Sequence, residues 1–154
     1  MVSRMKTIFD EATRAELIGR IRTLDATRTA RWGRMTVYQM VRHCTQWEAW
    51  IQGKPRRTYK QTFIGRVFGR MALKNTIGDD KPLKRNIPTT KEFKVRDASG
   101  DVAAESTRWV ALVEDYAHYS NPDFIHDFFG KMTREQIGQL AYKHTDHHLR
   151  QFGV

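Results

Sequence analysis

The chain has 154 residues and a formal net charge of +10, from 27 Lys and Arg against 17 Asp and Glu. Its hydrophobic fraction of 40% is typical of a globular protein, and no apolar run approaches the ~18 residues of a membrane-spanning helix. The composition therefore predicts one domain over residues 1–154 and argues against a membrane partner.

The N-terminal segment lacks the apolar stretch and small-residue cleavage site of a signal peptide, so a cytoplasmic location is the default expectation. The single cysteine, Cys44, cannot form an internal disulfide, which agrees with a reducing compartment. We expect Cys44 to be a small core residue of a helix rather than a nucleophile.

Basic residues are densest in the middle third of the chain, between positions 54 and 85. This concentration leaves two interpretations open. The chain could be a basic nucleic-acid or anion-binding module, or the charges could simply solvate the surface. No aromatic-basic stacking motif accompanies these residues, so we favour the second interpretation and do not expect nucleic acid as the partner.

The first half of the chain contains two strong helix signals. Residues 11–24 place apolar side chains on one face, as a surface helix with a buried stripe does. The second helix begins at Thr36, whose spacing from Gln39 has the capping-box form, and it should end near Gly53. A weaker helix is predicted over residues 61–75, amphipathic and with its basic side chains Arg66, Arg70 and Lys74 on the outer side.

The second half contains two more helix signals. Residues 101–119 form an apolar stripe that Asn121-Pro122 ends, and the last helix runs over residues 133–152 from a capping box at Thr133 and Gln136. We therefore predict an all-α fold whose core includes Ile21, Met40, Cys44, Trp47, Trp109, Val113, Leu140 and Ala141. The connection of almost fifty residues between the second and third long helices favours an up-down-down-up four-helix bundle.

Three histidines lie within five positions of the last helix. His144 and His148 are four residues apart, so on a helix their Cβ atoms lie about 5–6 Å from each other and both imidazoles can reach one metal ion. His144 and His147 form a poorer pair. From the spacing alone, a cluster of solvated or core-capping histidines is equally acceptable. His43, at the flank of the buried face of the second helix, is the candidate for a third ligand.

The residues resemble those of a known family. A histidine within the capped MTVYQMVRHC segment, together with the C-terminal YKHTDHHLRQFGV and the FFGKMTREQ before it, resembles the DinB-like superfamily, and in particular an uncharacterised branch of it. The resemblance extends from about residue 12 to residue 154. It implies an up-down-down-up bundle and a divalent metal ion held by His43, His144 and His148, with His147 present but not a ligand.

Three neutral imidazoles leave a coordination position open to water or substrate, as in catalytic metal sites. The resemblance implies a thiol-dependent S-transferase or a small-molecule hydrolase, with a low-molecular-weight thiol among the candidate substrates. Three imidazole ligands suit zinc, nickel or iron, and also copper. No catalytic base can be assigned, since we interpret Glu48 and Asp146 as surface carboxylates. His118 and His126 are expected to pack or to face solvent, and a homodimer stays open.

Overall fold

The structure, a computed structural model, describes residues 5–154. These residues form five α-helices and two short 3-10 helices, and no β-strand forms among them. The α-helices are α1 (Glu11–Ile21), α2 (Val37–Gln52), α3 (Phe63–Ile77), α4 (Val102–Glu114) and α5 (Arg134–Gln151). The 3-10 helices are η1 (Lys91–Phe93) and η2 (Asp115–His118). The predicted all-α class is confirmed.

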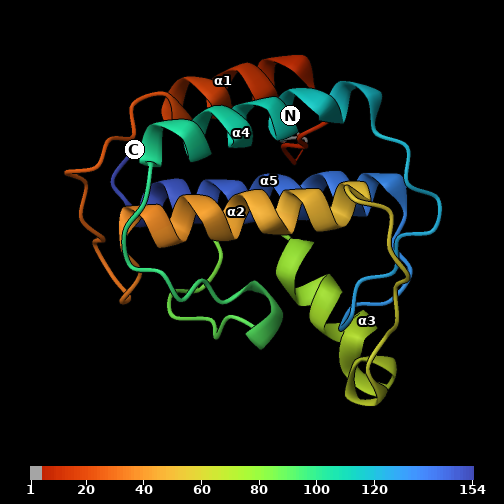
Figure 1. Cartoon of the computed structure of the whole chain (residues 1–154). Helices are drawn as coiled ribbons and strands as arrows, with labels where there is room; N and C mark the ends of the chain where they lie inside the picture. Colours follow the sequence, from red (N-terminus) through yellow and green to blue (C-terminus); the bar gives the residue numbers. More distant parts are fainter. Residues whose placement is uncertain (1–4) are drawn as a thin grey trace.

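Four of the helices pack along one another, as Figure 1 shows. The helices α1 and α4 lie over α2 and α5, whereas α3 stands at the edge of the molecule. The chain runs in the same direction through α2 and α4, and in the opposite direction through α1 and α5. All eight side chains predicted for the core are buried: Ile21, Met40, Cys44, Trp47, Trp109, Val113, Leu140 and Ala141.

Capping boxes fix where α2 and α5 begin. The Gln39 amide donates to the Thr36 hydroxyl over 3.2 Å, and the Thr36 amide donates to the Gln39 side chain over 3.0 Å. The same reciprocal pair joins Thr133 and Gln136, at 3.2 and 2.9 Å. Because a helix start sets the direction of every later side chain, these two boxes determine which way the histidines of α2 and α5 point.

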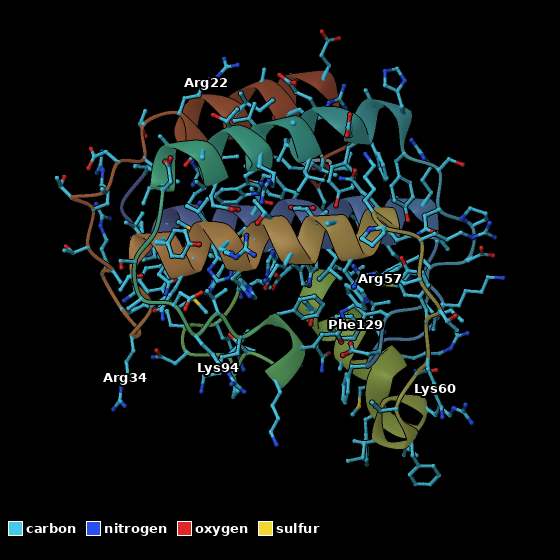
Figure 2. All side chains as sticks on the ribbon, viewed as in Figure 1. Arg22, Arg34, Arg57, Lys60, Lys94 and Phe129 are labelled. Carbon is cyan, nitrogen blue, oxygen red and sulfur yellow. The ribbon has the colours of Figure 1, made fainter. Side chains whose placement is uncertain are left out.

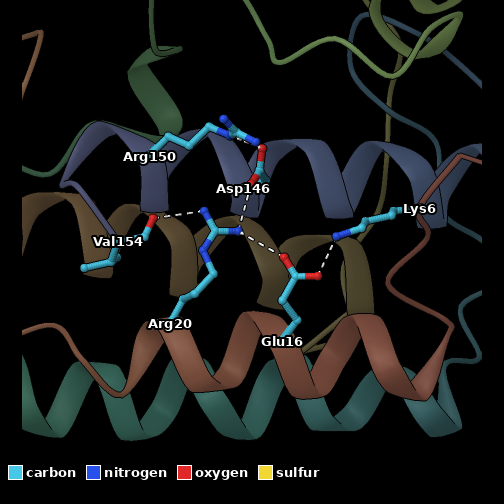
Figure 3. A network of polar contacts seen from close by, with 6 residues as sticks. All are labelled: Lys6, Glu16, Arg20, Asp146, Arg150 and Val154. Atoms are coloured by element: carbon cyan, nitrogen blue, oxygen red, sulfur yellow. Dashed lines mark hydrogen bonds and ion pairs between the residues drawn. The ribbon is translucent and has the colours of Figure 1, made fainter.

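The interpretation of Glu48 and Asp146 as surface carboxylates was wrong. Glu48 is fully buried and accepts hydrogen bonds from the hydroxyls of Tyr116 and Thr145, the latter over 2.9 Å. Asp146, only 5% exposed, accepts from Arg20 and Arg150 over 2.7 Å each, within the network drawn in Figure 3. Hydrogen bonds compensate the burial of both groups, which an amphipathic pattern does not reveal.

The structure contains α3, but the face assigned to its apolar side chains was wrong. Gly65 and Gly69 pack against the backbone of Phe128, and Leu73 and Ile77 continue the buried side. Lys143 of α5 holds the C-terminal end of α3 against the bundle, because its Nζ donates a hydrogen bond to the Thr76 carbonyl over 2.8 Å. The large apolar side chains of α3 therefore face away from the bundle, because only a face without Cβ atoms lets the helix approach this backbone so closely.

This close approach predicts the effect of a methyl group at position 69. A Cβ at Gly69 would overlap the Phe128 carbonyl oxygen, so Gly69→Ala should lower the free energy of unfolding by about 1–3 kcal/mol. At the exposed Gly19 of α1 a Cβ meets nothing within 4 Å, and Gly19→Ala should raise it by up to ~1 kcal/mol. Urea unfolding of both variants measures the difference. A gain in stability at both positions would contradict the packing of α3 on Phe128.

Candidate metal centre

The structure brings together the three histidines that the sequence singles out. His43 projects from α2, and His144 and His148 project from neighbouring turns of α5, with one ligand nitrogen of each lying within 4.8 Å of the others. The ring centroids are separated by 5.2 Å for His43 and His144, 4.8 Å for His43 and His148, and 4.7 Å for His144 and His148. The cluster is a candidate site for one cation.

Hydrogen bonds orient two of the rings. The Nδ1 of His43 lies 3.0 Å from the Phe93 carbonyl oxygen, which can only accept, so this nitrogen carries the proton. The Nδ1 of His148 lies 2.9 Å from Oε1 of Gln151, whose amide nitrogen in turn donates to the Trp32 carbonyl over 3.1 Å. In both rings the proton on Nδ1 leaves the lone pair on Nε2, the nitrogen on the opposite side of the ring, and metal-binding histidines are held by outer partners in this way.

The third ring carries an unsatisfied nitrogen. Among the residues that the structure describes, no group forms a hydrogen bond with the buried Nδ1 of His144. Its Nε2 lies 3.2 Å from Nε2 of His43, close to the ~3.3 Å that separates two nitrogen ligands of a tetrahedral zinc ion. The ring stacks on Trp47, with centroids 3.9 Å apart and planes at 16°. A cation bound by Nε2 of His43, His144 and His148 would take up the lone pairs that converge there, so the donor set fits a divalent metal ion.

Burial keeps the three imidazoles neutral. It lowers the pKa of His43, and it lowers the pKa values of His144 and His148 well below the usual range, with a further contribution from the neighbouring histidines. A neutral imidazole is the form that binds metal, and protons therefore compete with an ion only in acid. The electrostatics of the cluster favour a ligand role over a charged, solvated one.

The remaining histidines lie outside the cluster. His147 turns toward Trp32, with ring centroids 5.7 Å apart, and burial lowers its pKa. His118 is exposed on η2. His126 accepts backbone hydrogen bonds from Phe128 and Phe129 at its Nδ1, over 3.1 Å each, and packs there as expected.

A cavity of about 270 Å³ opens beside the cluster. Its walls are mostly apolar and aromatic, and they include Trp47, Trp50, Phe93 and Phe129. Figure 2 labels Phe129 beside α3. A cavity of this size and character suits a small molecule rather than a polymer.

Some parts of this site have no signal in the sequence, and one has a signal that was not used. The carbonyl of Phe93 and the carboxylate of Asp127 come from the irregular connections, where periodicity gives no signal. Asp127 lines the cavity beside His126, whose ring lowers the pKa of the carboxyl, so the group is ionised at neutral pH. Gln151 could have been found, because a glutamine three positions after His148 lies one turn further along the same helix.

These features define an all-helical protein with a buried three-histidine cluster beside a small cavity. The model of the family described as "Protein of unknown function (DUF1569)" matches residues 2–153, and the chain belongs to this family. No curated protein and no solved structure matches the chain.

Proposed function

We propose that this protein is a metal-dependent enzyme that acts on a small molecule, with a divalent ion held by His43, His144 and His148. The observation that carries the proposal is the convergence of three neutral imidazoles, two of them oriented from outside, beside a cavity of about 270 Å³. A structural metal site has no need of a cavity, whereas a catalytic one keeps a position open to water or substrate.

The reaction class is either S-transfer from a low-molecular-weight thiol or hydrolysis. A divalent ion held in this way lowers the pKa of a bound water toward ~7 or binds a thiolate, and zinc, nickel and iron all accept imidazole ligands. The protein's own contribution is to orient His43 and His148 through Phe93 and Gln151, and to surround the reacting molecule with aromatic walls. Neither Glu48 nor Asp146 is available as a base, because both are occupied elsewhere.

We further propose that the chain is a single DinB-like domain, an up-down-down-up four-helix bundle, and that it acts in the cytoplasm. The parallel direction of α2 and α4 supports this arrangement. The long connection that carries α3 and η1 supports it as well, because parallel neighbours require a crossover.

The hydrogen bond from His148 to Gln151 gives a test of the ligand assignment. Gln151→Ala should lower zinc affinity by about 10–100-fold, the usual cost of losing an outer partner of a ligand histidine. The matched control is Gln139→Ala on the same helix, a similarly buried glutamine that is hydrogen-bonded to Glu135 instead. Titration calorimetry of both variants gives the affinities, and equal affinities would remove His148 from the ligand set.

The activity is tested by screening thiol-transfer and hydrolytic substrates on zinc-, nickel- and iron-loaded protein. We expect turnover that a chelator abolishes and that metal restores. The rival function is nucleic-acid binding through the basic residues between positions 54 and 85. A nucleic-acid-binding protein would show an affinity that falls with salt. The logarithm of its binding constant, plotted against the logarithm of the salt concentration, would have a slope of about −0.9 per duplex phosphate contacted. Tight, salt-sensitive binding of nucleic acid without any metal-dependent turnover would favour the nucleic-acid-binding function over the enzyme.

A further inference from the structure

The helix α3 exposes a continuous apolar face. Five large side chains on it are exposed, by 80% for Phe63 and by 51–61% for Ile64, Val67, Phe68 and Met71. In the part of the chain that the structure describes, only one other large apolar side chain, Ile87, is exposed to this degree. A large aromatic side chain has an area of ~150–250 Å². With the exposed fractions above, the exposed area of the five side chains is roughly 500–600 Å², at the upper end of the range for the largest apolar patch of a monomer.

The position of this face suits contact with something outside the molecule. It lies on the side of α3 opposite Gly65 and Gly69, which pack against the Phe128 backbone. Figure 1 shows α3 at the edge of the fold, with its N-terminal end furthest from the other helices. An extended partner could therefore contact the N-terminal half of α3 without meeting the bundle.

The charge around the face has one sign. No acidic residue occurs between Glu48 and Asp79. Arg66, Arg70 and Lys74 form a stripe along one flank of the helix, and Lys60 precedes its N-terminus, as labelled in Figure 2. None of these four cations forms an ion pair within residues 5–154. The partner must accept apolar side chains and supply negative charge alongside them.

We propose that α3 docks this protein on the surface of an anionic lipid bilayer. The apolar side chains would enter the boundary between headgroups and acyl chains, and the four cations would lie against anionic headgroups, as in interfacial amphipathic helices. No helix among the described residues is long and apolar enough to span a bilayer, so α3 lies on the surface. The composition predicts no membrane partner, and the proposed surface contact differs from that prediction without requiring a spanning segment.

The charge distinguishes a bilayer from a second copy of the chain. In an antiparallel two-fold pair of α3 helices, the basic flanks of both copies would lie on the same side of the contact and repel each other. An anionic lipid surface instead attracts all four cations at once, and each cation should raise the affinity roughly fivefold.

The test is sedimentation with vesicles of phosphatidylcholine containing about 30% phosphatidylserine, beside vesicles of phosphatidylcholine alone. We expect binding to the mixed vesicles and little to the neutral ones. Phe63→Ser with Phe68→Ser should weaken binding by about 100-fold or more, and Arg66→Ala with Arg70→Ala by about 30-fold. All four side chains are exposed, so the variants should keep the melting temperature of the wild type.

The matched control is Arg22→Ala with Arg34→Ala, which removes the same charge from the side of the molecule remote from α3 in Figure 2. It should lower binding by less than about threefold, because screening limits the action of distant charges. Equal binding to neutral vesicles, an equal loss in this control, or no vesicle binding at all would overturn the proposal. A stable dimer that the Phe63 and Phe68 variant converts to a monomer, without lipid binding, would assign the face to a second copy.

Discussion

Replacing His43, His144 or His148 with alanine is expected to lower the affinity for zinc by more than about 100-fold, above the cost of losing an outer hydrogen bond. The reason is geometric. The three ligand nitrogens lie within 4.8 Å of one another, and no carboxylate or cysteine joins them in the cluster formed by the described residues. Removing any one leaves two imidazoles, which bind a divalent ion weakly. Titration calorimetry against zinc measures the effect.

The control for this series is His147→Ala. This residue belongs to the same run of histidines, but its ring faces Trp32 and it is absent from the cluster, so its removal should leave the affinity unchanged. Loss of binding only in the His147 variant, or unchanged binding in the His43 variant, would refute the assignment. Zinc should also raise the melting temperature of the wild type, by an amount equivalent to ~2.7 kcal/mol at 100 times the Kd.

The second large effect concerns Glu48. Burial raises the pKa of this carboxyl to about 7 from its ordinary value of 4.5, although hydrogen bonds from Tyr116 and Thr145 oppose the rise. Between these two values the folded state holds a proton that the unfolded state has released. Raising the pH through this window therefore destabilises the fold, by about 3 kcal/mol in total for this group.

Glu48→Gln should remove this penalty, because the amide is neutral at every pH. The four histidines with lowered pKa values titrate over a neighbouring range with the opposite sign. The quantity to measure is therefore the difference in unfolding free energy between variant and wild type, from urea denaturation of metal-free protein. The unfolding free energy of the variant, relative to that of the wild type, should rise by about 3 kcal/mol as the pH increases from ~4.5 to ~7.

A second variant distinguishes this account from a general effect of the substitution. The Tyr116 hydroxyl donates to Glu48 and lowers the pKa of its carboxyl, so Tyr116→Phe should extend the pH-dependent loss of stability to higher pH. A stability difference between Glu48→Gln and wild type that does not change with pH would contradict the raised pKa.

The sequence was sufficient for the histidine cluster because two regular signals combine there. The i, i+4 spacing places His144 and His148 on one face of α5, and the capping boxes at Thr36 and Thr133 fix the rotation of α2 and α5. The helix class and all eight predicted core residues follow from the same periodicity. Whether a metal binds there stays a prediction, because neither spacing nor geometry shows an ion.

The sequence was insufficient where tertiary contacts override local patterns. In α3 the large apolar residues predict the buried side, yet glycines form its N-terminal half, because Gly65 and Gly69 allow contact with the Phe128 backbone. The sequence predicts that a carboxylate such as Glu48 is exposed unless its hydrogen-bond partners are known. Those partners, Tyr116 and Thr145, lie 68 and 97 positions from Glu48 along the chain. Long-range pairs of this kind leave no trace in periodicity.

The central claim is most directly tested by the metal content of protein purified without a histidine tag, measured in parallel on wild type and His43→Ala after zinc loading and desalting. We expect about one ion per chain in the wild type and less than about a tenth of that in the variant. Equal metal content in the two proteins, or a wild type that retains no ion, would contradict it.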